Sequence, residues 1–438
     1  MLAALGFVTA ACSALPPPGD EAPFRDVAAR IGHAPGLEDA TDSERLHALL
    51  AEPLTPRTAA ETALLNNHAL KAELEELGVV WAEALAPARL KNPTLDIAAR
   101  FPGPELDLGL MQNIMTLLER PARRDIAEST YEAKRLELSA RILDLDHDVA
   151  TAAHELQAAL MTKALLEDNL SAADAAYELG RELRAAGNLS ELVFLTEQVA
   201  YENARLALAE HELVVSGLRE RLTSLMGLWG ADANWEMAPT LAKPPAAEPP
   251  LDDLEARAID SRYELASLRQ EIDARRQELA LAKRWGWAGN DGEAGVESER
   301  HGDGDWASGP SVKLALPIFD RGETKAARAA ARLRAAEHRL EALAIDVRAE
   351  VRAARQRLAT QRKLIEHYDT VLLPLYARRV ELSFKEYNYM LVGPDTLLGV
   401  KQQEIDAKRR AVEALEAYWL ARANLERAIG GRLLGEAP

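Results

Sequence analysis

The chain has 438 residues, enough for two or three ordinary domains or for one long repeated one. Apolar residues make up 48% and charged residues 28% of the sequence, and the prevalence of Ala, Leu, Glu and Arg favours long helices and coiled coils over a compact mixed domain. The formal net charge of −18 argues against a nucleic-acid partner, because an acidic surface repels phosphates.

The N-terminus resembles an export signal. Residues 1–11 form an apolar run that ends in small residues, which is typical of a secretory signal peptide. Cys12 is the only cysteine, and the stretch TAAC that it closes resembles the site at which bacterial lipoproteins are acylated. We therefore expect a lipid on Cys12 that anchors the chain to a membrane, and an extended N-terminal segment over residues 12–53. The alternative is a plain signal peptide followed by an incidental cysteine.

The remainder of the chain is a tandem duplication. Its halves are residues 54–236 and 251–431, joined by a Pro-rich connector over residues 237–250 and followed by a tail, residues 432–438. Four pairs of short segments repeat in the same order at offsets of 195 to 206 residues. They are GPELDLGL (from Gly103) with GPSVKLAL (from Gly309), GNLSELVFLTEQ (187–198) with VGPDTLLGVKQQ (392–403), LTSLMG (222–227) with LERAIG (425–430), and NNHALKA (66–72) with SRYELAS (261–267).

Each half repeats one plan of helix, strand pair, helix, tight turn and helix. The first helix of the first half is expected over residues 57–90, which are rich in Ala, Leu and Glu. The helix after the strands carries apolar residues at alternating spacings of 4 and 3, which is the heptad seam of a coiled coil. Both such helices exceed roughly 40 residues and must pack along others. The seam residues are Leu138, Ile142, Leu145, Val149, Ala152, Leu156 and Ala159, and Leu340, Val347, Val351, Ala354 and Leu358.

Alternating segments predict four strands. Three lie at residues 94–101, 105–112 and 311–316, and the fourth is expected within residues 284–301, where Trp285 and Trp287 alternate. Such segments suit transmembrane strands with one face toward lipid, although a soluble hairpin with one wet face alternates in the same way. Four strands cannot close a barrel, so a membrane role requires several chains to pool their strands. The apolar faces are Leu95, Ile97, Ala99 and Phe101; Leu106, Leu108 and Leu110; and Val312, Leu314 and Leu316.

The sequence contains no catalytic constellation. Its nine histidines lack metal-ligand spacing, and no phosphate-binding loop or nucleophile elbow is present. Residues 289–309 are Gly-rich and acidic; we interpret them as a solvated loop between the strands of the second hairpin, with a Ca²⁺-binding loop as the alternative. We therefore expect no enzyme activity, no metal site and no cofactor besides the lipid on Cys12.

Four stretches resemble the TolC-like outer membrane factors of Gram-negative export systems. They are AAETALLNNHALKA, ARLKNPTL, GPSVKLALPIFDRGETKAARAAA and YWLARANLERAIGG, and the resemblance covers nearly all of residues 54–431. It implies a mostly α fold with a small β part, in which a homotrimer closes a 12-stranded barrel in the cell outer membrane and continues as an α-helical tunnel across the periplasm. It also implies two partners, a periplasmic adaptor and an inner-membrane pump.

The resemblance assigns the two tight turns as periplasmic tips where adaptors dock. We expect the tip glycines to permit the turn conformation and the nearby polar residues Asn188, Ser190, Asp395 and Thr396 to cap the following helices, as ordinary helical hairpins would also allow. The tip residues are Gly187, Asn188, Leu189 and Ser190, and Gly393, Pro394, Asp395 and Thr396.

A tunnel constriction is expected six positions after each tip glycine, where some members of the family carry aspartates. This chain has Val193 and Gly399 there, so the constriction is apolar unless other residues, such as Glu191 or Asp395, form the gate.

The function implied by the resemblance is a passive trimeric duct for efflux or type I secretion, with energy from the pump. The exported substrate stays open between a drug, a metal ion such as copper, and a protein. The alternative function is a lipid-anchored periplasmic coiled-coil adaptor or scaffold, in which the strands would form a soluble β-domain.

Overall fold

The computed structural model describes residues 22–31, 42–100, 105–249, 251–288, 292–301 and 304–433. They fall into two compact units, each of which takes segments from both halves of the duplicated sequence. The predicted signal peptide, Cys12 and most of the predicted tail lie outside the described residues. Of the described residues, those in 71–140 and 263–345 belong to the first unit, together with Ala22 and Pro23, and those in 24–70, 141–262 and 346–433 belong to the second.

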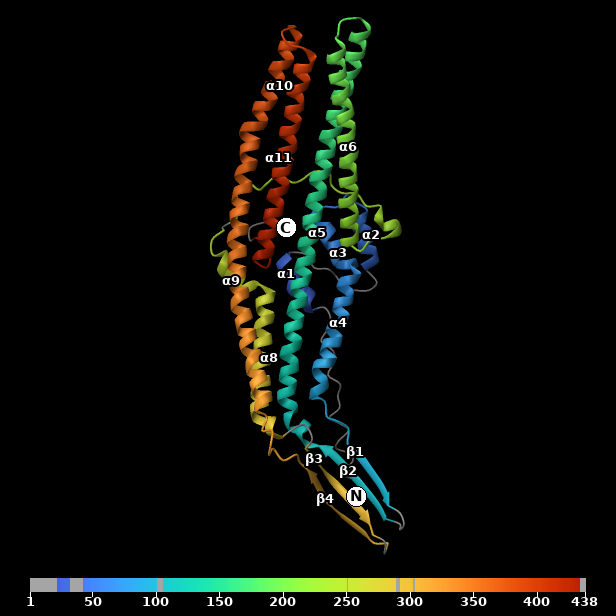
Figure 1. Cartoon of the computed structure of the whole chain (residues 1–438), viewed down its shortest axis with the longest axis vertical. Coiled ribbons are helices and arrows are strands. Elements are labelled where there is room, and N and C mark those ends of the chain that lie inside the picture. The colour runs from blue at the N-terminus through green and yellow to red at the C-terminus, as the bar shows by residue number, and fades with distance from the viewer. Residues whose placement is uncertain are drawn as a thin grey trace. The chain divides into compact units, whose positions relative to one another are not determined.

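The first unit contains one antiparallel sheet of four strands (Figure 1). Strands 1 and 2 form the hairpin of the first half, strands 3 and 4 form that of the second, and the two inner strands pair with each other. All four strands predicted from alternation are therefore present, and the two halves contribute neighbouring strands. Their bounds are β1 (Thr94–Arg100), β2 (Glu105–Asn113), β3 (Glu293–Arg300) and β4 (Trp306–Lys313).

Two details of the second hairpin, which β3 and β4 form, were predicted wrongly. Trp285 ends helix α8 (Tyr263–Trp285) and Trp287 lies in the following 3-10 turn, so neither belongs to a strand. Lys283 and Arg284 in the last turn of α8 favour this helical end, because cations stabilise a helix C-terminus. The expected loop over residues 289–309 is also wrong, since β3 lies within it and pairs on both sides. Pairing with two neighbours offsets the low strand propensity of its Gly and Glu residues.

Strand β4 lies closer to the N-terminus than the strand predicted over residues 311–316. It begins at Trp306 and ends at Lys313, so Leu314 and Leu316 follow the strand instead of lying on its apolar face. The segment SVKLAL therefore continues the alternation beyond the end of the hydrogen-bonded ladder, which stops where β3 begins at Glu293.

Helices α4 (His68–Leu85), α5 (Ile114–Ala185), α8 and α9 (Glu323–His367) supply the helical part of the first unit. Trp81 of α4 meets Tyr131 of α5 edge to face, with ring centroids 5.0 Å apart. The hydroxyl of Ser267 in α8 donates to a backbone carbonyl of α5 at 2.7 Å. An ion pair of 3.7 Å joins Arg276 of α8 to Glu337 of α9. These contacts join helices whose residues are far apart in the chain.

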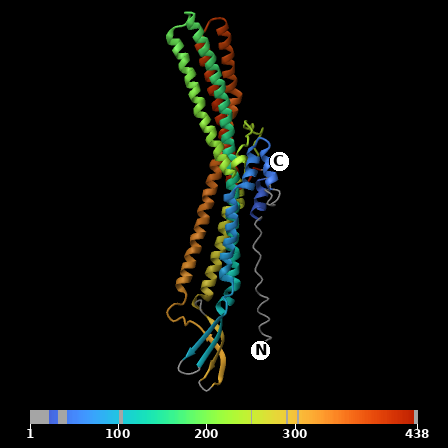
Figure 2. The ribbon, with the colours of Figure 1, turned by 90° about the vertical axis from the view of Figure 1, so that its right-hand side faces the viewer.

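Two helical hairpins dominate the second unit, and Figures 1 and 2 show both from different sides. The first consists of the later part of α5 and α6 (Glu191–Leu225), and the second of α10 (Leu373–Asn388) and α11 (Pro394–Ala428). A π-helical turn, Tyr368–Leu372, joins α9 to α10. The helices α5 and α9 span 72 and 45 residues, which confirms the predicted length.

The predicted heptad seam is the buried face of these helices. Fully or largely buried members are Leu138, Ile142, Val149, Ala152, Leu156 and Ala159 in α5, and Val347, Val351, Ala354 and Leu358 in α9. In the second unit the seam packs on α3 (Pro56–Asn66), the end of α6 and Trp235, whose indole N–H donates to Thr223 Oγ1 at 3.0 Å. The seam is therefore a structural core, as expected for a bundle.

The N-terminal segment differs from the extended form predicted for residues 12–53. Its described parts are two short helices, α1 (Ala22–Ile31) and α2 (Asp42–Leu50). Phe24 and Val27 of α1 are buried at helical spacing, and Leu46 and Leu50 of α2 pack against the core of the second unit. Apolar pairs three or four residues apart thus favour helices that a reading based on proline and glycine content missed.

The repeated segments NNHALKA and SRYELAS mark two equivalent helix breaks. The helix predicted over residues 57–90 is broken at Asn67, whose side chain accepts from the Leu70 N–H at 3.0 Å and donates to the Leu225 carbonyl at 2.8 Å. In the second half the break lies between α7 (Leu254–Ser261) and α8, and Ser261 donates to the Ile429 carbonyl at 2.5 Å. Each break therefore binds the C-terminal end of the last helix of its own half, α6 in the first half and α11 in the second.

The remaining short elements are 3-10 turns, at Ala86–Ala88, Gly230–Ala233 and Gly286–Ala288. Within the Pro-rich connector, residues 238–249 contain no helix or strand.

Candidate functional site: a two-faced sheet and two helical tips

The strand register sorts the sheet into one apolar and one polar face. Directly paired residues share a face, and Leu95 lies opposite Leu110, which in turn lies opposite Val296. Leu95 and Ile97 each expose 64% of their surface, although they belong to a regular sheet. We name this the apolar face. Its members are Leu95, Ile97, Ala99, Leu106, Leu108, Leu110, Ala294, Val296, Ser298, Arg300, Trp306, Ser308, Pro310 and Val312.

The opposite face of the sheet is acidic. Asp96, Asp107, Glu297 and Glu299 surround a hollow of about 690 Å³ on this side. Lys313 partly offsets their charge through an ion pair of 3.6 Å with Glu297. Glycines at paired positions, such as Gly109 beside Asp96, leave room between the carboxylates. The sheet thus separates an apolar surface from an acidic one.

Strands β1 and β4 lie at the two edges of the sheet. Within the described residues, β1 pairs only with β2, and β4 pairs only with β3. Each outer strand therefore presents a row of backbone donors and acceptors, which can pair with a strand from another chain.

The first tip, residues 185–192, has the conformation predicted from its glycine. Gly187 has φ of +78°, and the N–H groups of Gly187 and Asn188 donate to carbonyls of the last turn of α5 at 2.9 and 2.8 Å. This is the Schellman arrangement that ends many helices. The hydroxyl of Ser190 accepts from the Val193 N–H at 3.4 Å and caps α6, as predicted, whereas Asn188 does not cap it.

The second tip, residues 391–398, differs from its prediction. Met390 takes the left-handed conformation with φ of +58°, and its N–H donates to the Tyr387 carbonyl at 2.8 Å. Gly393 has φ of −80° and is the N-cap of α11 without a side-chain cap. Asp395 and Thr396 lie inside α11, where Pro394 is the first residue, so neither is its cap. The two tip glycines therefore do not occupy equivalent positions. Met390 is the equivalent of Gly187 at the end of the first helix of its hairpin, and Gly393 is the equivalent of Ser190 at the start of the second.

Both tips expose apolar side chains. Leu192 is largely exposed at the first tip, and Tyr389, Met390 and Leu391 are largely exposed at the second, with Met390 reaching 94%. A non-glycine residue in the left-handed region that is also a fully exposed methionine is unusual. Exposed apolar groups gathered at a turn are typical of protein interaction sites.

The two residues expected at a constriction lie near the start of the returning helices. Val193 is half-buried in the first turn of α6, and a Cβ added at Gly399 in α11 would meet no atom within 4 Å. Their role in a tunnel stays a prediction.

The helices α5 and α11 bury carboxylates that sequence patterns did not single out. Burial raises the pKa of Asp146 to about 6 and that of Glu416 to about 7, and Glu155 and Glu413 raise the Glu416 pKa further. Burial also lowers the pKa of His154 to about 4, and its ring stacks on Trp419 with centroids 5.2 Å apart. One carboxylate among 70 acidic residues gives no sequence signal.

Two features are absent from the described residues. No group of three or more His, Cys, Asp or Glu side chains is placed to hold a metal ion there. Among the helices described, none combines the length and the apolar character needed to cross a membrane.

Comparison with known proteins identifies the type of fold. Residues 105–228, which run from β2 through the first helical hairpin, match the family model described as outer membrane efflux protein. Over these residues the chain is similar to the outer membrane efflux proteins. The resemblance drawn from the sequence is thereby confirmed, and the mostly helical efflux-channel fold with its small sheet agrees with the predicted fold class.

Solved structures with the efflux-channel fold match most of the chain at low sequence identity. The outer membrane channel CmeC of Campylobacter jejuni has a TM-score of 0.68 at 15% identity, covering 91% of this chain and 88% of its own. The outer membrane protein VceC of Vibrio cholerae has a TM-score of 0.67 at 14% identity, covering 90% and 97%. CusC, described for transmembrane channel formation, has a TM-score of 0.69 at 15% identity, covering 86% and 92%. A sequence comparison with curated proteins finds no match.

Proposed function

We propose that this chain is the outer membrane channel of a tripartite efflux system. The observation that carries the proposal is the sheet, whose other face is acidic while its apolar face exposes more than half of the surface of Leu95, Ile97, Leu110, Val296 and Val312. A lipid-facing strand surface backed by a polar lumen has this pattern. The efflux-channel fold and the family match over residues 105–228 support the same function. The chain acts as a passive duct and not as an enzyme.

Three chains complete the channel in this proposal. The outer strands β1 and β4 each have one unpaired edge in the described structure, so β1 of one chain can pair with β4 of the next. Three sheets of four strands close a 12-stranded barrel, and the acidic faces line its lumen. The helices extend from the barrel as a periplasmic tunnel, and the lipid on Cys12 adds a second anchor in the outer membrane.

The helical tips are the docking sites for a periplasmic adaptor in this proposal. The exposed residues Leu192, Tyr389, Met390 and Leu391 supply apolar contacts there. Val193 and Gly399, close to the tips, form the constriction, and an inner-membrane pump supplies the energy. An acidic lumen favours small cationic molecules or metal ions as cargo, because it raises their local concentration.

The test places an arginine on either face of the sheet. Leu108→Arg and Val296→Arg put a charge on the apolar face, and each should destabilise insertion by about 2–4 kcal/mol near mid-bilayer. Ala98→Arg on the acidic face is the matched control and should be tolerated. The readouts are the amount of trimer that resists dissociation in detergent and its presence in the outer membrane fraction.

Two outcomes would contradict this function. Unchanged assembly of both apolar-face variants would remove the membrane role of the sheet. Release of the Cys12→Ala variant into the soluble fraction without detergent would favour the alternative, a lipid-anchored periplasmic adaptor or scaffold.

A further inference from the structure

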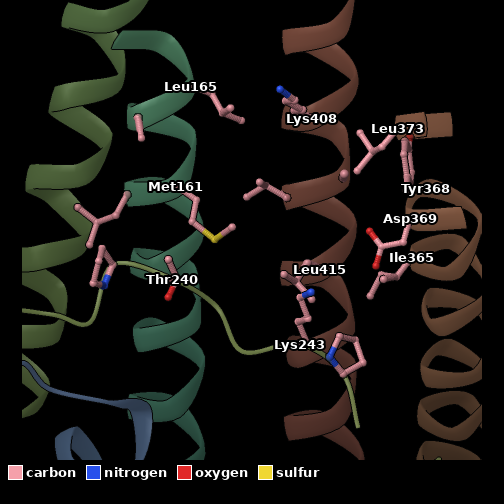
Figure 3. Close-up of a pocket in the computed structure, with 16 residues that line it drawn as sticks. Met161, Leu165, Thr240, Lys243, Ile365, Tyr368, Asp369, Leu373, Lys408 and Leu415 are labelled. Carbon is pink, nitrogen blue, oxygen red and sulfur yellow. The ribbon is translucent and has the colours of Figure 1, made fainter. Parts of the chain in front are cut away.

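A cavity of about 590 Å³ lies in the second unit, among α5, the π-helical turn, α11 and the Pro-rich connector (Figure 3). Its walls are apolar. They are formed mainly by Met161, Leu165, Ile365, Leu373, Val412 and Leu415. This volume lies within the range of small-molecule sites, which are typically apolar with a few polar groups. The resemblance to efflux channels does not account for it, since none of its lining residues belongs to the sheet or to the tips.

A few charged side chains complete the lining of the cavity. Lys243 comes from the connector, Lys408 from α11 and Asp369 from the π-helical turn. Lys408 also pairs with Glu404 at 3.1 Å. Lys243, in contrast, has no ion pair or hydrogen bond within the part of the chain that the structure describes. Figure 3 shows Lys408 facing Leu165 across the cavity, and Lys243 beside Leu415.

The balance of these charges selects the ligand. Lys408 is already neutralised by its ion pair with Glu404, so Lys243 is the lining ammonium group that has no ion pair among the described residues. A ligand with an alkyl chain removes apolar wall from water, and an anionic head group gives Lys243 the partner that the described chain lacks. A cationic head group at the same place would instead lie beside the like charge of Lys243.

We infer that this cavity binds a single-chain amphipathic anion, a long-chain carboxylate, with its alkyl chain against α5 and α11 and its head group on Lys243. Binding of this kind is independent of export, because it involves neither the sheet nor the tips. The connector residue Lys243 and the π-helical turn, a local helix type that often accompanies function, belong to the same site.

Photoaffinity labelling of the full-length protein in non-ionic detergent tests the inference. The probe is a fatty acid with a diazirine on its alkyl chain, and labelled residues are mapped by mass spectrometry. Label is expected on the α5 and α11 segments that line the cavity. Dodecanoate should compete, and the competing concentration should fall about fourfold for each methylene added to the competitor. Dodecyltrimethylammonium, with the same chain and the opposite charge, should compete at least tenfold less well.

Variants separate the cavity from non-specific labelling. Lys243→Glu should reduce competition by dodecanoate at least tenfold, because the charge-assisted contact is reversed. Ala411→Trp and Ala164→Trp should abolish the label by filling the space. Lys363→Glu and Ala175→Trp make the same changes at exposed positions outside the cavity and should leave the label intact.

Three results would overturn the inference. They are label confined to the apolar face of the sheet, equal competition by the cationic surfactant, and unchanged labelling in Lys243→Glu and both tryptophan variants. Occupation of the cavity by a segment of a second copy of the chain would appear as failure of every competitor, and would overturn it as well.

Discussion

At the scale of single residues, the two tips show how different side chains can occupy equivalent positions. Gly187 and Met390 end their helices in the same left-handed conformation, with φ of +78° and +58°. Gly393 has an extended backbone, which any residue can adopt, and serves only as N-cap of α11. The left-handed conformation costs a residue with a Cβ roughly 1–2 kcal/mol relative to glycine. Met390 therefore bears a local strain at the point where it is most exposed.

Alanine substitutions at the two tip glycines should have different effects. Gly187→Ala is expected to lower the free energy of unfolding by about 1 kcal/mol, because alanine resists positive φ. Gly393→Ala should cost less, about 0.5 kcal/mol, because φ is negative there and only the preference for glycine over alanine at an N-cap is lost. Chemical denaturation of the purified protein measures both, and an equal loss in the two variants would contradict the assignment of Met390 as the equivalent of Gly187.

At the scale of elements, the packing of α5 against α11 buries charge. Burial is the main cause that raises the pKa of Glu416 to about 7, and the carboxylates of Glu155 and Glu413 add to it. Glu155 is in turn paired with Arg221 of α6 at 2.6 Å. A carboxyl group with a raised pKa in the folded state favours folding at low pH. That contribution is present below the ordinary pKa of glutamate and is lost as the pH rises through about 7.

Replacing Glu416 with glutamine should remove this pH dependence. Between pH 5 and pH 8 the folded wild type loses the proton on Glu416, whereas glutamine stays neutral. Glu416→Gln is therefore expected to unfold at a higher temperature than the wild type at pH 8, with the difference shrinking toward pH 5. Thermal unfolding at both pH values measures it, and Glu386→Gln on the exposed side of α10 is the control. A variant that is less stable at pH 8 would show that the carboxylate is stabilised by its surroundings.

At the scale of the whole molecule, the duplication explains which strands lie at the edges of the sheet. Each half supplies one hairpin to the sheet and one helical hairpin to the second unit, and β2 and β3 join the halves. In each half a break between two shorter helices also binds the C-terminal end of α6 or α11, through Asn67 or Ser261. The chain thus pairs its own halves through the middle of the sheet and leaves β1 and β4 at the edges.

Cysteine cross-linking tests whether these edges meet between chains. In a Cys12→Ser background, Thr94→Cys on β1 and Lys313→Cys on β4 place thiols near the helical end of each edge strand. A short bifunctional thiol reagent should produce cross-linked dimers and trimers of the double variant only. The single variants, and a pair of Thr94→Cys with Trp306→Cys at the other end of β4, should stay uncross-linked. Absence of any cross-link in the double variant would argue against β1–β4 pairing.

Several features followed from local patterns in the sequence. The heptad seam, the presence of four strands and the duplication all depend on residues close in the chain or on repeated spacing. The same holds for Gly187 and the Ser190 cap. Where tertiary contacts compete, the patterns were less informative: pairing on both sides made a strand of the Gly-rich residues 293–300, and α8 continued through Trp285.

The sequence by itself therefore determined the order of the elements, the buried seam and the apolar alternation of the strands, because periodicity is a property of neighbouring residues. Only the tertiary structure decided that Met390 takes the place of a tip glycine, since the register of a turn depends on the two helices that it joins. It also decided that Met161, Lys243 and Val412 line one cavity. Residues this far apart in the chain meet only through the packing of long helices, and no local pattern encodes such a meeting.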